Sequence, residues 1–232
     1  VRYSAVNPDS YIKSNIDGFY NILKLVKIKK PKKFIFASSS SVYGDAKYYP
    51  SKENFILKPK NIYALSKKFN EELAENYLKK IKTKIIGLRF FTLYGPWGRP
   101  DMLLIKFFEH AKNKKYFKLN SKGNHLRDFT YIEDAINLVV KLSFNKSKEK
   151  YNIFNLCSSK PLKVFNIIKK LKKITDFKKI KIIGANELEV VKTYGSNIKI
   201  LTNLKNKKFR FTNFEVALKK THDWYKEFNK FI

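Results

Sequence analysis

Residues 32–44 read KKFIFASSSSVYG, and this stretch decides the fold. The apolar run from Phe34 to Ala37 is short and nearly continuous. Such a run is typical of a strand buried in a parallel sheet. A row of serines follows at once, and Gly44 closes the segment. Because ligands of open α/β sheets bind beyond the carboxyl ends of the strands, we expect one or two of these hydroxyls to face a crevice.

Helices and short apolar strands alternate along the rest of the chain. The strands are expected at 32–38, 83–91, 116–120, 151–156 and 179–184, and the helices at 10–30, 62–82, 103–115, 129–144, 161–174 and 213–228. This alternation predicts an α/β protein with a mainly parallel sheet. A loop rich in glycine and proline, TLYGPWGRPD, begins at Thr92, and we place the boundary between two domains there.

The charge of the chain is strongly positive, at +31, and would normally favour a nucleic-acid partner. Lysine supplies almost all of it and is spread over helices and tails, as in KIKKPKK and KKLKK. We therefore expect a solvated basic surface and no specific nucleic-acid partner. Binding of polyanions in general stays as an alternative function, and its mark would be a steep dependence on salt.

Other features limit the classes of protein that the chain can belong to. Cys157 is the single cysteine, so no internal disulfide can form. The three histidines, His110, His125 and His222, lack the spacing of a metal site. No apolar run approaches the roughly 18 residues of a membrane span, and we expect no membrane partner and a cytoplasmic location.

The segment Tyr63-Ala-Leu-Ser-Lys67 carries the clearest chemistry. On a helix, residues four apart lie on one face, so the phenol and the ammonium are neighbours. An ammonium beside a phenol favours the phenolate, which can act as a base. With a serine hydroxyl nearby, the pair can move a proton on and off a sugar hydroxyl. YxxxK alone is a weak signal, but next to SSSSVYG at a strand end it becomes a strong one.

Together, VRYSAVNPDSYIKSNIDGFYNIL, FIFASSSSVYG, YALSKK, GLRFFTLYGPWGRPDM and RDFTYIEDA resemble the extended short-chain dehydrogenase/reductases. Within the NAD-dependent epimerase/dehydratase family, they are most similar to the UDP-glucuronate 4-epimerase branch of capsule biosynthesis. The resemblance implies a Rossmann-like, mainly parallel sheet and a smaller C-terminal substrate-binding domain. It assigns 1–92 to the NAD-binding domain and 93–232 to the substrate-binding region, with 130–157 returning to the Rossmann sheet.

The resemblance also assigns residues to the catalytic and cofactor sites. Tyr63 corresponds to the catalytic base, and Lys67 to the lysine that holds the nicotinamide ribose. Ser39 corresponds to the catalytic serine, which also contacts the substrate, with Ser38 and Ser40 as competing assignments. The positions that line the NAD site are Asn15, Ser38, Tyr63, Lys67 and Phe91.

Four residues are assigned to the UDP-sugar substrate: Ser39, Thr92, Arg99 and Arg127. Thr92 and Arg99 fall where this branch grips the sugar carboxylate, and a guanidinium fork suits that role. Arg127 matches the arginine that meets the UDP pyrophosphate, and its neighbour Asp128 is expected to be a structural partner. A salt bridge within the loop is the alternative role for Arg99.

The implied activity is the NAD-dependent 4-epimerisation of UDP-glucuronate to UDP-galacturonate through a transient 4-keto sugar. A UDP-hexose 4-epimerase for a neutral or N-acetylated sugar is the nearest alternative, and a catalytically silent truncated product is another. The resemblance also implies a homodimer as a possible assembly. Dehydratase relatives carry an acidic pair where this chain has SSSS and VYG, so elimination chemistry is disfavoured.

The family opens with a strand and a GxxGxxG turn that cradles the NAD pyrophosphate. None of the eight glycines forms that pattern, and the choice between NAD and NADP depends on it. We therefore expect a chain truncated at its N-terminus, lacking the first strands of the Rossmann sheet.

These 232 residues alone are predicted to bind NAD weakly and to turn over no substrate. Calorimetric titration with NAD checks this expectation, and micromolar affinity would contradict it.

Overall fold

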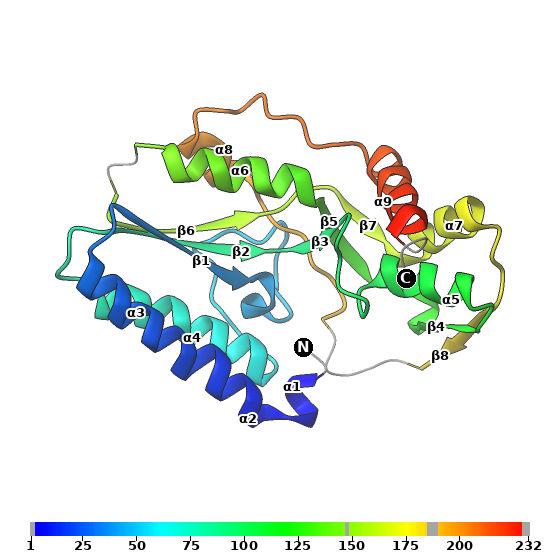
Figure 1. Ribbon diagram of the computed structural model, residues 1–232, viewed down its shortest axis with the longest axis horizontal. Helices are drawn as coiled ribbons and strands as arrows, with labels where there is room; N and C mark the ends of the chain where they lie inside the picture. Colours follow the sequence, from blue (N-terminus) through cyan, green and yellow to red (C-terminus); the bar gives the residue numbers. More distant parts are fainter. Residues whose placement is uncertain (1–2, 147–148, 185–189, 229–232) are drawn as a thin grey trace.

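A computed structural model describes residues 3–146, 149–184 and 190–228. The described chain has two neighbouring parts, both visible in Figure 1. One is a parallel sheet covered by helices, and the other is a group of shorter strands and helices beside it. The α/β architecture with mainly parallel strands is the one expected from the sequence.

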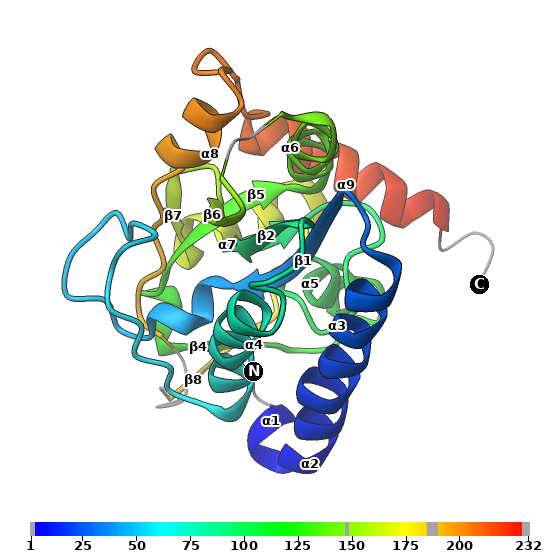
Figure 2. The same ribbon diagram turned by 90° about the vertical axis from the view of Figure 1, so that its left-hand side faces the viewer.

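In the part that the structure describes, the larger sheet has the order β1-β2-β6, with every strand parallel to its neighbour. These strands are β1 (Lys33–Ser39), β2 (Lys84–Phe90) and β6 (Tyr151–Leu156). Helices α3 (Gly18–Lys29) and α4 (Ile62–Tyr77) lie side by side on one face. Helices α6 (Ile132–Phe144) and α8 (Ile198–Asn203) cover the other, and Figure 2 shows these layers from the side.

Alternation along the strands builds a separate core on each face of the sheet. Toward α3 and α4, Phe36, Gly87 and Ile153 are neighbours in register across the three strands. Gly87 is required there, because a Cβ atom would lie 2.4 Å from Ile153 and 2.8 Å from Phe36. The opposite core, beneath α6 and α8, is formed mainly by Ile86, Leu88, Leu138, Leu142, Phe154 and Leu156.

The second part contains short strands that pair in two further sheets. The strands β3 (Thr92–Tyr94), β5 (Leu126–Tyr131) and β7 (Pro161–Lys163) form the order β3-β5-β7, and β4 (Phe117–Asn120) pairs with β8 (Ile180–Ile183). Helices α5 (Leu103–Lys112), α7 (Val164–Thr175) and α9 (Phe214–Phe228) pack against them. Asn213 Oδ1 accepts the amide of Glu215, which confirms this asparagine as the cap of α9.

Short helical segments complete the described chain: α1 (Tyr3–Val6), α2 (Pro8–Tyr11), the π-helix η1 (Ile12–Asp17), and the 3₁₀ helices η2 (Ser40–Tyr43) and η3 (Ser121–Gly123). The first helix expected from the sequence, 10–30, thus contains a π-helical turn. The expected polar turn after β1 is the helix η2, in which Val42 and Tyr43 are buried.

Strand pairing explains three expected boundaries that were wrong, two at the start of a helix and one in a loop. The helix expected from residue 129 begins at Ile132, since the preceding residues pair with β3. The helix expected from Pro161 begins at Val164, because Pro161 belongs to β7 and pairs antiparallel with β5. Thr92, expected in a loop, is the first residue of β3.

Asp128 links three segments beneath the loop that carries residues 193–196. Its carboxylate accepts the amide and hydroxyl of Ser158 at 3.1 and 2.7 Å, and the amide of Gly195 at 3.3 Å. Burial raises the pKa of Asp128 to about 6 despite these hydrogen bonds. The expected structural role of this residue is consistent with these contacts.

The raised pKa of Asp128 makes the folding stability of the protein depend on pH. The native Asp128 holds its proton more tightly than an ordinary aspartate with a pKa of 3.8, so folding is favoured by the protonated form. Its contribution to stability is therefore present below pH 3.8 and is lost as the pH rises through about 6. The loss is at most about 3 kcal/mol, at about 1.4 kcal/mol per unit of pKa.

Denaturant unfolding of the wild type and Asp128→Asn between about pH 3 and 7 checks this, because that range extends about one unit beyond each of the two pKa values. The wild type is expected to lose stability relative to the variant as the pH rises. A difference that is constant with pH, or that changes in the opposite direction, would contradict the assignment.

Candidate active site

Helix α4 carries the phenol and the ammonium predicted to be catalytic. Asn61 Oδ1 accepts the amide of Ala64 at 2.9 Å and caps the helix, so it begins immediately before Tyr63. Lys67 Nζ donates to the carbonyl of Ala37, near the end of β1, at 3.0 Å. Burial lowers the pKa of Lys67. The lysine is therefore held at the carboxyl end of the sheet, where the sequence predicted a ligand crevice.

Tyr63 is partly buried and is held by neighbours from the N-terminal segment. The ring of Tyr11 meets it edge-on with centroids 6.0 Å apart. Ser66 Oγ donates to the Tyr63 carbonyl at 2.8 Å, and Asn15 Nδ2 donates to Ser66 Oγ at 2.9 Å. Asn15 lies in the π-helical turn η1, a form of backbone that is frequent at functional sites. The structure thus joins Asn15 to Tyr63 through Ser66, which the sequence analysis did not single out.

The serines at the end of β1 have different surroundings. Ser39 is buried, and its Oγ accepts the amide of Ser41 at 3.2 Å, which caps η2. Ser38 Oγ instead donates to the carboxylate of Glu71 on α4 at 2.5 Å. Ser40 is partly exposed at the start of η2. Of the three, Ser38 has its hydroxyl committed to a buried protein carboxylate.

A polar row crosses the sheet β1-β2-β6 one residue before the end of each strand. Ser38, Arg89 and Asn155 are neighbours in register on β1, β2 and β6. Glu71 bonds the first two residues, and Tyr43 bonds the last two. The adjacent row, Phe36–Gly87–Ile153, is apolar, so the character of the sheet changes from hydrocarbon to polar next to the strand ends.

The pair at the centre of this row is a buried, two-point ion pair. Arg89 donates from Nε to Glu71 Oε1 at 2.9 Å and from Nη2 to Glu71 Oε2 at 2.7 Å. Only 4% and 6% of the two side chains is exposed. Arg89 Nη1 also donates to the Tyr43 hydroxyl at 2.8 Å and the Glu53 carbonyl at 3.0 Å. The sequence analysis missed Glu71, although its spacing from Tyr63 and Lys67 is a usable signal.

Arg99, the residue predicted to bind the sugar carboxylate, pairs with a carboxylate of its own loop. Its side chain is 70% exposed and forms a two-point pair with Asp101, with N–O distances of 2.9 and 2.7 Å. The hydrogen bond to Asp101 is the largest cause of a raised Arg99 pKa, and Tyr63 and Tyr11 add to it. In this structure the partner of the Arg99 guanidinium is Asp101.

The loop that carries Arg99 is anchored by aromatic contacts. Trp97 contacts Trp224 and Phe228 of α9, with ring centroids 5.4 and 5.1 Å away. Trp97 has a positive φ of 61°, which is uncommon for a bulky residue. Its contacts with α9 compensate for this strain and hold the loop in place.

The remaining predicted residues lie at the ends of other strands. Phe91 follows β2 and packs against Tyr43, and Gly195 approaches it so closely that a Cβ atom would lie 2.4 Å from the ring. Thr92 pairs with Phe129 at the start of β3. Arg127, from β5, donates to the carbonyl of Val191 at 2.9 Å, so it lies away from the α4 contacts and beside the 190–197 segment.

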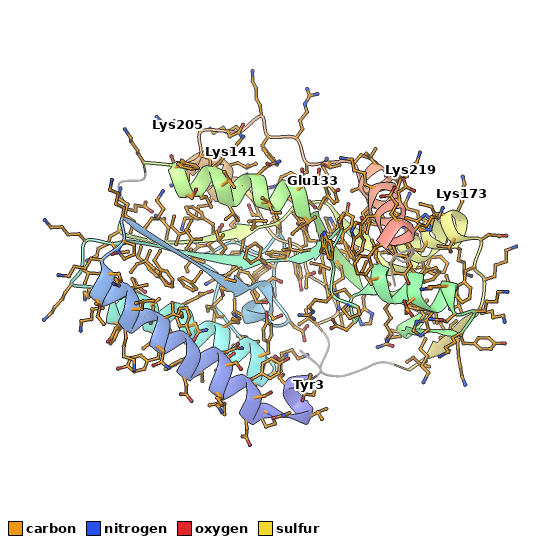
Figure 3. The ribbon with its side chains drawn as sticks, in the orientation of Figure 1. Tyr3, Glu133, Lys141, Lys173, Lys205 and Lys219 are labelled. Atoms are coloured by element: carbon orange, nitrogen blue, oxygen red, sulfur yellow. The ribbon has the colours of Figure 1, made fainter. Side chains whose placement is uncertain are left out.

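The structure also places the single cysteine and several of the lysines. Cys157 is fully buried, and burial raises its thiol pKa, which confirms a core position. The lysines labelled in Figure 3 project from separate elements: Lys141, Lys173, Lys205 and Lys219.

Within the described ranges, no group of His, Cys, Asp and Glu side chains has the arrangement of a metal site. None of the described helices has the length and apolarity of a membrane span.

The sequence matches a family model over most of its length. Residues 1–157 match the NAD dependent epimerase/dehydratase family. Protein CapI of Staphylococcus aureus is 34% identical over 99% of this chain and 74% of its own length. UDP-glucuronate 4-epimerase 5 of Arabidopsis thaliana is 36% identical over 98% of this chain, which covers 56% of that protein.

Solved structures agree with this assignment. The UDP-glucuronic acid 4-epimerase of Bacillus cereus, solved with UDP-glucuronic acid and NAD, is 28% identical with a TM-score of 0.86. The match covers 95% of this chain and 69% of that one. The UDP-glucose 4-epimerase of Thermotoga maritima shares the fold, with a TM-score of 0.90, 24% identity, and coverage of 98% and 74%.

Sequence and fold therefore lead to one assignment, and it includes the expected cofactor, NAD. The match to the family extends over the strand-end serines, Tyr63 and Lys67. The chain belongs to the NAD-dependent epimerase/dehydratase family, among its nucleotide-sugar epimerases.

Proposed function

We propose that this protein interconverts UDP-glucuronate and UDP-galacturonate by epimerisation at C4 through a transient 4-keto sugar. The observation that carries the proposal is the similarity to the UDP-glucuronate 4-epimerases of Arabidopsis thaliana and Bacillus cereus, and the exposed guanidinium fork of Arg99 adds to it. A uronate bears its carboxylate on C5, next to C4. A base for the C4 hydroxyl and a fork for the carboxylate must therefore serve the same sugar, and the electrostatic influence of Tyr63 on Arg99 is consistent with this.

The chain's own residues supply the proton chemistry and the binding. Tyr63 takes the proton of the C4 hydroxyl, and Ser39 forms a hydrogen bond with the same oxygen. The 4-keto sugar then turns in the site, and Tyr63 returns the proton to the new hydroxyl. Arg127 binds the UDP phosphates, for which a guanidinium is well suited.

The surroundings of Lys67 fit the ribose end of NAD. In the described part of the chain, the Ala37 carbonyl is its one hydrogen-bond acceptor, while an ammonium has three N–H donors. The spare donors of this partly buried group suit ribose hydroxyls, with Asn15 nearby through Ser66. When bound, NAD accepts the C4 hydride and returns it to the opposite face of the sugar. The 232 residues contain no GxxGxxG turn for its pyrophosphate.

The pair between Arg99 and Asp101 is consistent with a role in binding. Both side chains are about two-thirds exposed, at 70% and 66%. Exposed ion pairs contribute only about 0–1 kcal/mol, so a substrate carboxylate can replace Asp101 at little cost. Asp101 would then act as a stand-in that keeps the guanidinium extended before substrate arrives.

A neutral-sugar 4-epimerase is the second candidate, supported by the Thermotoga maritima neighbour at the level of fold. In that case Arg99 would remain with Asp101 and make no contact with the sugar. The two candidates therefore differ at one side chain. Removal of that side chain separates them.

Replacement of the proposed base is the first test. Tyr63→Phe is expected to lower kcat by about 10²–10⁴, the usual contribution of a positioned acid–base group. NMR detection of UDP-galacturonate formed from UDP-glucuronate, by the protein as its gene encodes it, measures this. Tyr116→Phe makes the same change at a 63% exposed ring and serves as the control. Activity of Tyr63→Phe equal to that of the control would refute the proposal.

Replacement of the proposed carboxylate fork tests the substrate. Arg99→Ala is expected to lower kcat/KM for UDP-glucuronate by about 10–100-fold, since a charge-assisted hydrogen bond is worth about 1.5–3 kcal/mol. Any residual turnover of UDP-glucose is expected to change by less than about 3-fold, because no charge is lost from that complex. Arg210→Ala, at an exposed arginine, is the control. Kinetics of Arg99→Ala equal to those of Arg210→Ala on both sugars would contradict the role of Arg99 and favour the neutral-sugar candidate.

A further inference from the structure

The structure assigns a positioning role to Glu71, held between Ser38 and Arg89. We infer that this buried carboxylate fixes helix α4 against the sheet so that Tyr63 and Lys67 meet the sugar at the strand ends. The inference rests on the proposed function, because it presumes that Tyr63 is the base.

The geometry of α4 makes Glu71 a suitable anchor. Tyr63, Lys67 and Glu71 follow one another at intervals of one helical turn, on the side of α4 that approaches the sheet. At about 1.5 Å per residue, Glu71 lies roughly 12 Å along the axis from Tyr63. Because a helix is stiff along its axis, an anchor at Glu71 fixes both the height and the rotation of Tyr63.

The hydrogen bonds of Glu71 fix the orientation of its side chain as well as its position. The Glu71 carboxylate accepts from Ser38 Oγ on β1 and, at both oxygens, from the guanidinium of Arg89 on β2. The Tyr151 hydroxyl from β6 donates to the Glu71 carbonyl at 2.9 Å. Three adjacent strands of one sheet thus hold one residue of α4, and the planar fork of arginine sets the orientation of the carboxylate.

The Glu71–Arg89 pair is also hydrogen-bonded to residues before and after Ser39, the cap of η2. Ser38 immediately precedes Ser39, and its hydroxyl bonds Glu71. Tyr43, at the end of the turn, accepts from Arg89 and donates to Asn155 at 2.7 Å. The backbone on each side of Ser39 is therefore tied to the same ion pair that anchors the Tyr63 helix. The relative position of the two catalytic side chains depends on it.

A purely stabilising role is the competing explanation. Buried ion pairs are poor sources of stability, because desolvation offsets their attraction. A positioning role predicts a different pattern, in which the reaction suffers and substrate binding does not. Misplacement of a reacting group by about 1 Å can cost about 10²-fold in rate.

The test uses Ser38→Ala, which removes one hydrogen bond and leaves the ion pair in place. Its kcat is expected to fall about 10–100-fold while KM for the UDP-sugar changes by less than about 3-fold. Ser38→Thr restores the hydroxyl and is expected to recover most of the rate. Glu71→Gln is expected to fall further, and Glu75→Gln, at an exposed residue one turn along α4, is the matched control.

Hydrogen exchange supplies a readout besides activity. Amides of α4 between Ile62 and Glu71 are expected to exchange faster in folded Ser38→Ala and Glu71→Gln than in Glu75→Gln. Unchanged kcat in folded Ser38→Ala, no rescue by Ser38→Thr, or loss of the fold in Ser38→Ala would overturn the positioning role. Full activity of Tyr63→Phe would instead overturn the proposed function on which it rests.

Discussion

The ion pair between Arg89 and Glu71 is the interaction on which the site depends. It is buried beneath the carboxyl ends of the strands and joins the central strand β2 to helix α4. Placing two charges there costs several kcal/mol in desolvation, and only a fully satisfied arrangement offsets this cost. Here Ser38, Tyr43 and the Glu53 carbonyl supply the remaining hydrogen bonds. Loss of one partner would leave a buried charge uncompensated, so each residue constrains the others.

The sheet is apolar where the helices pack and polar where the chemistry takes place. The row Phe36–Gly87–Ile153 fills the core, and the next row on that face is Ser38–Arg89–Asn155. Gly87 allows the aromatic ring of Phe36 and the Ile153 side chain to close over the strand. The helices can therefore pack tightly below the site while the strand ends stay open to polar groups.

Much of this arrangement could be predicted from the sequence. The serine row at the end of a buried strand, the Tyr63–Lys67 spacing and the alternation of helices and strands identify the fold and the catalytic helix. The boundaries of β5 and β7 could not be predicted, because pairing between distant strands decides them. FTY and PLK have no strong local preference against a helix. Their neighbours in the sheet are known only from the structure.

The site was predictable in its residue types and less so in its contacts. The sequence indicated a carboxylate partner for Arg99, in a sugar or within its own loop, but it gave no means of naming Asp101, and it did not point to Glu71. Ser66, which joins Asn15 to Tyr63, is an ordinary polar residue within a helical pattern. Such contacts depend on how helices pack, and only a three-dimensional arrangement reveals them.

The proposed function unites these features: a helix anchored by a buried charge would present a phenol to the C4 hydroxyl while Arg99 would receive the neighbouring carboxylate. A crystal structure of the protein as its gene encodes it, with UDP-glucuronate and NAD bound, tests this most directly. The account predicts Tyr63 Oη and Ser39 Oγ about 2.6–3.2 Å from the C4 oxygen, with the Arg99 fork transferred from Asp101 to the sugar carboxylate. A sugar bound with its C4 oxygen away from Tyr63, or Arg99 still paired with Asp101, would contradict it.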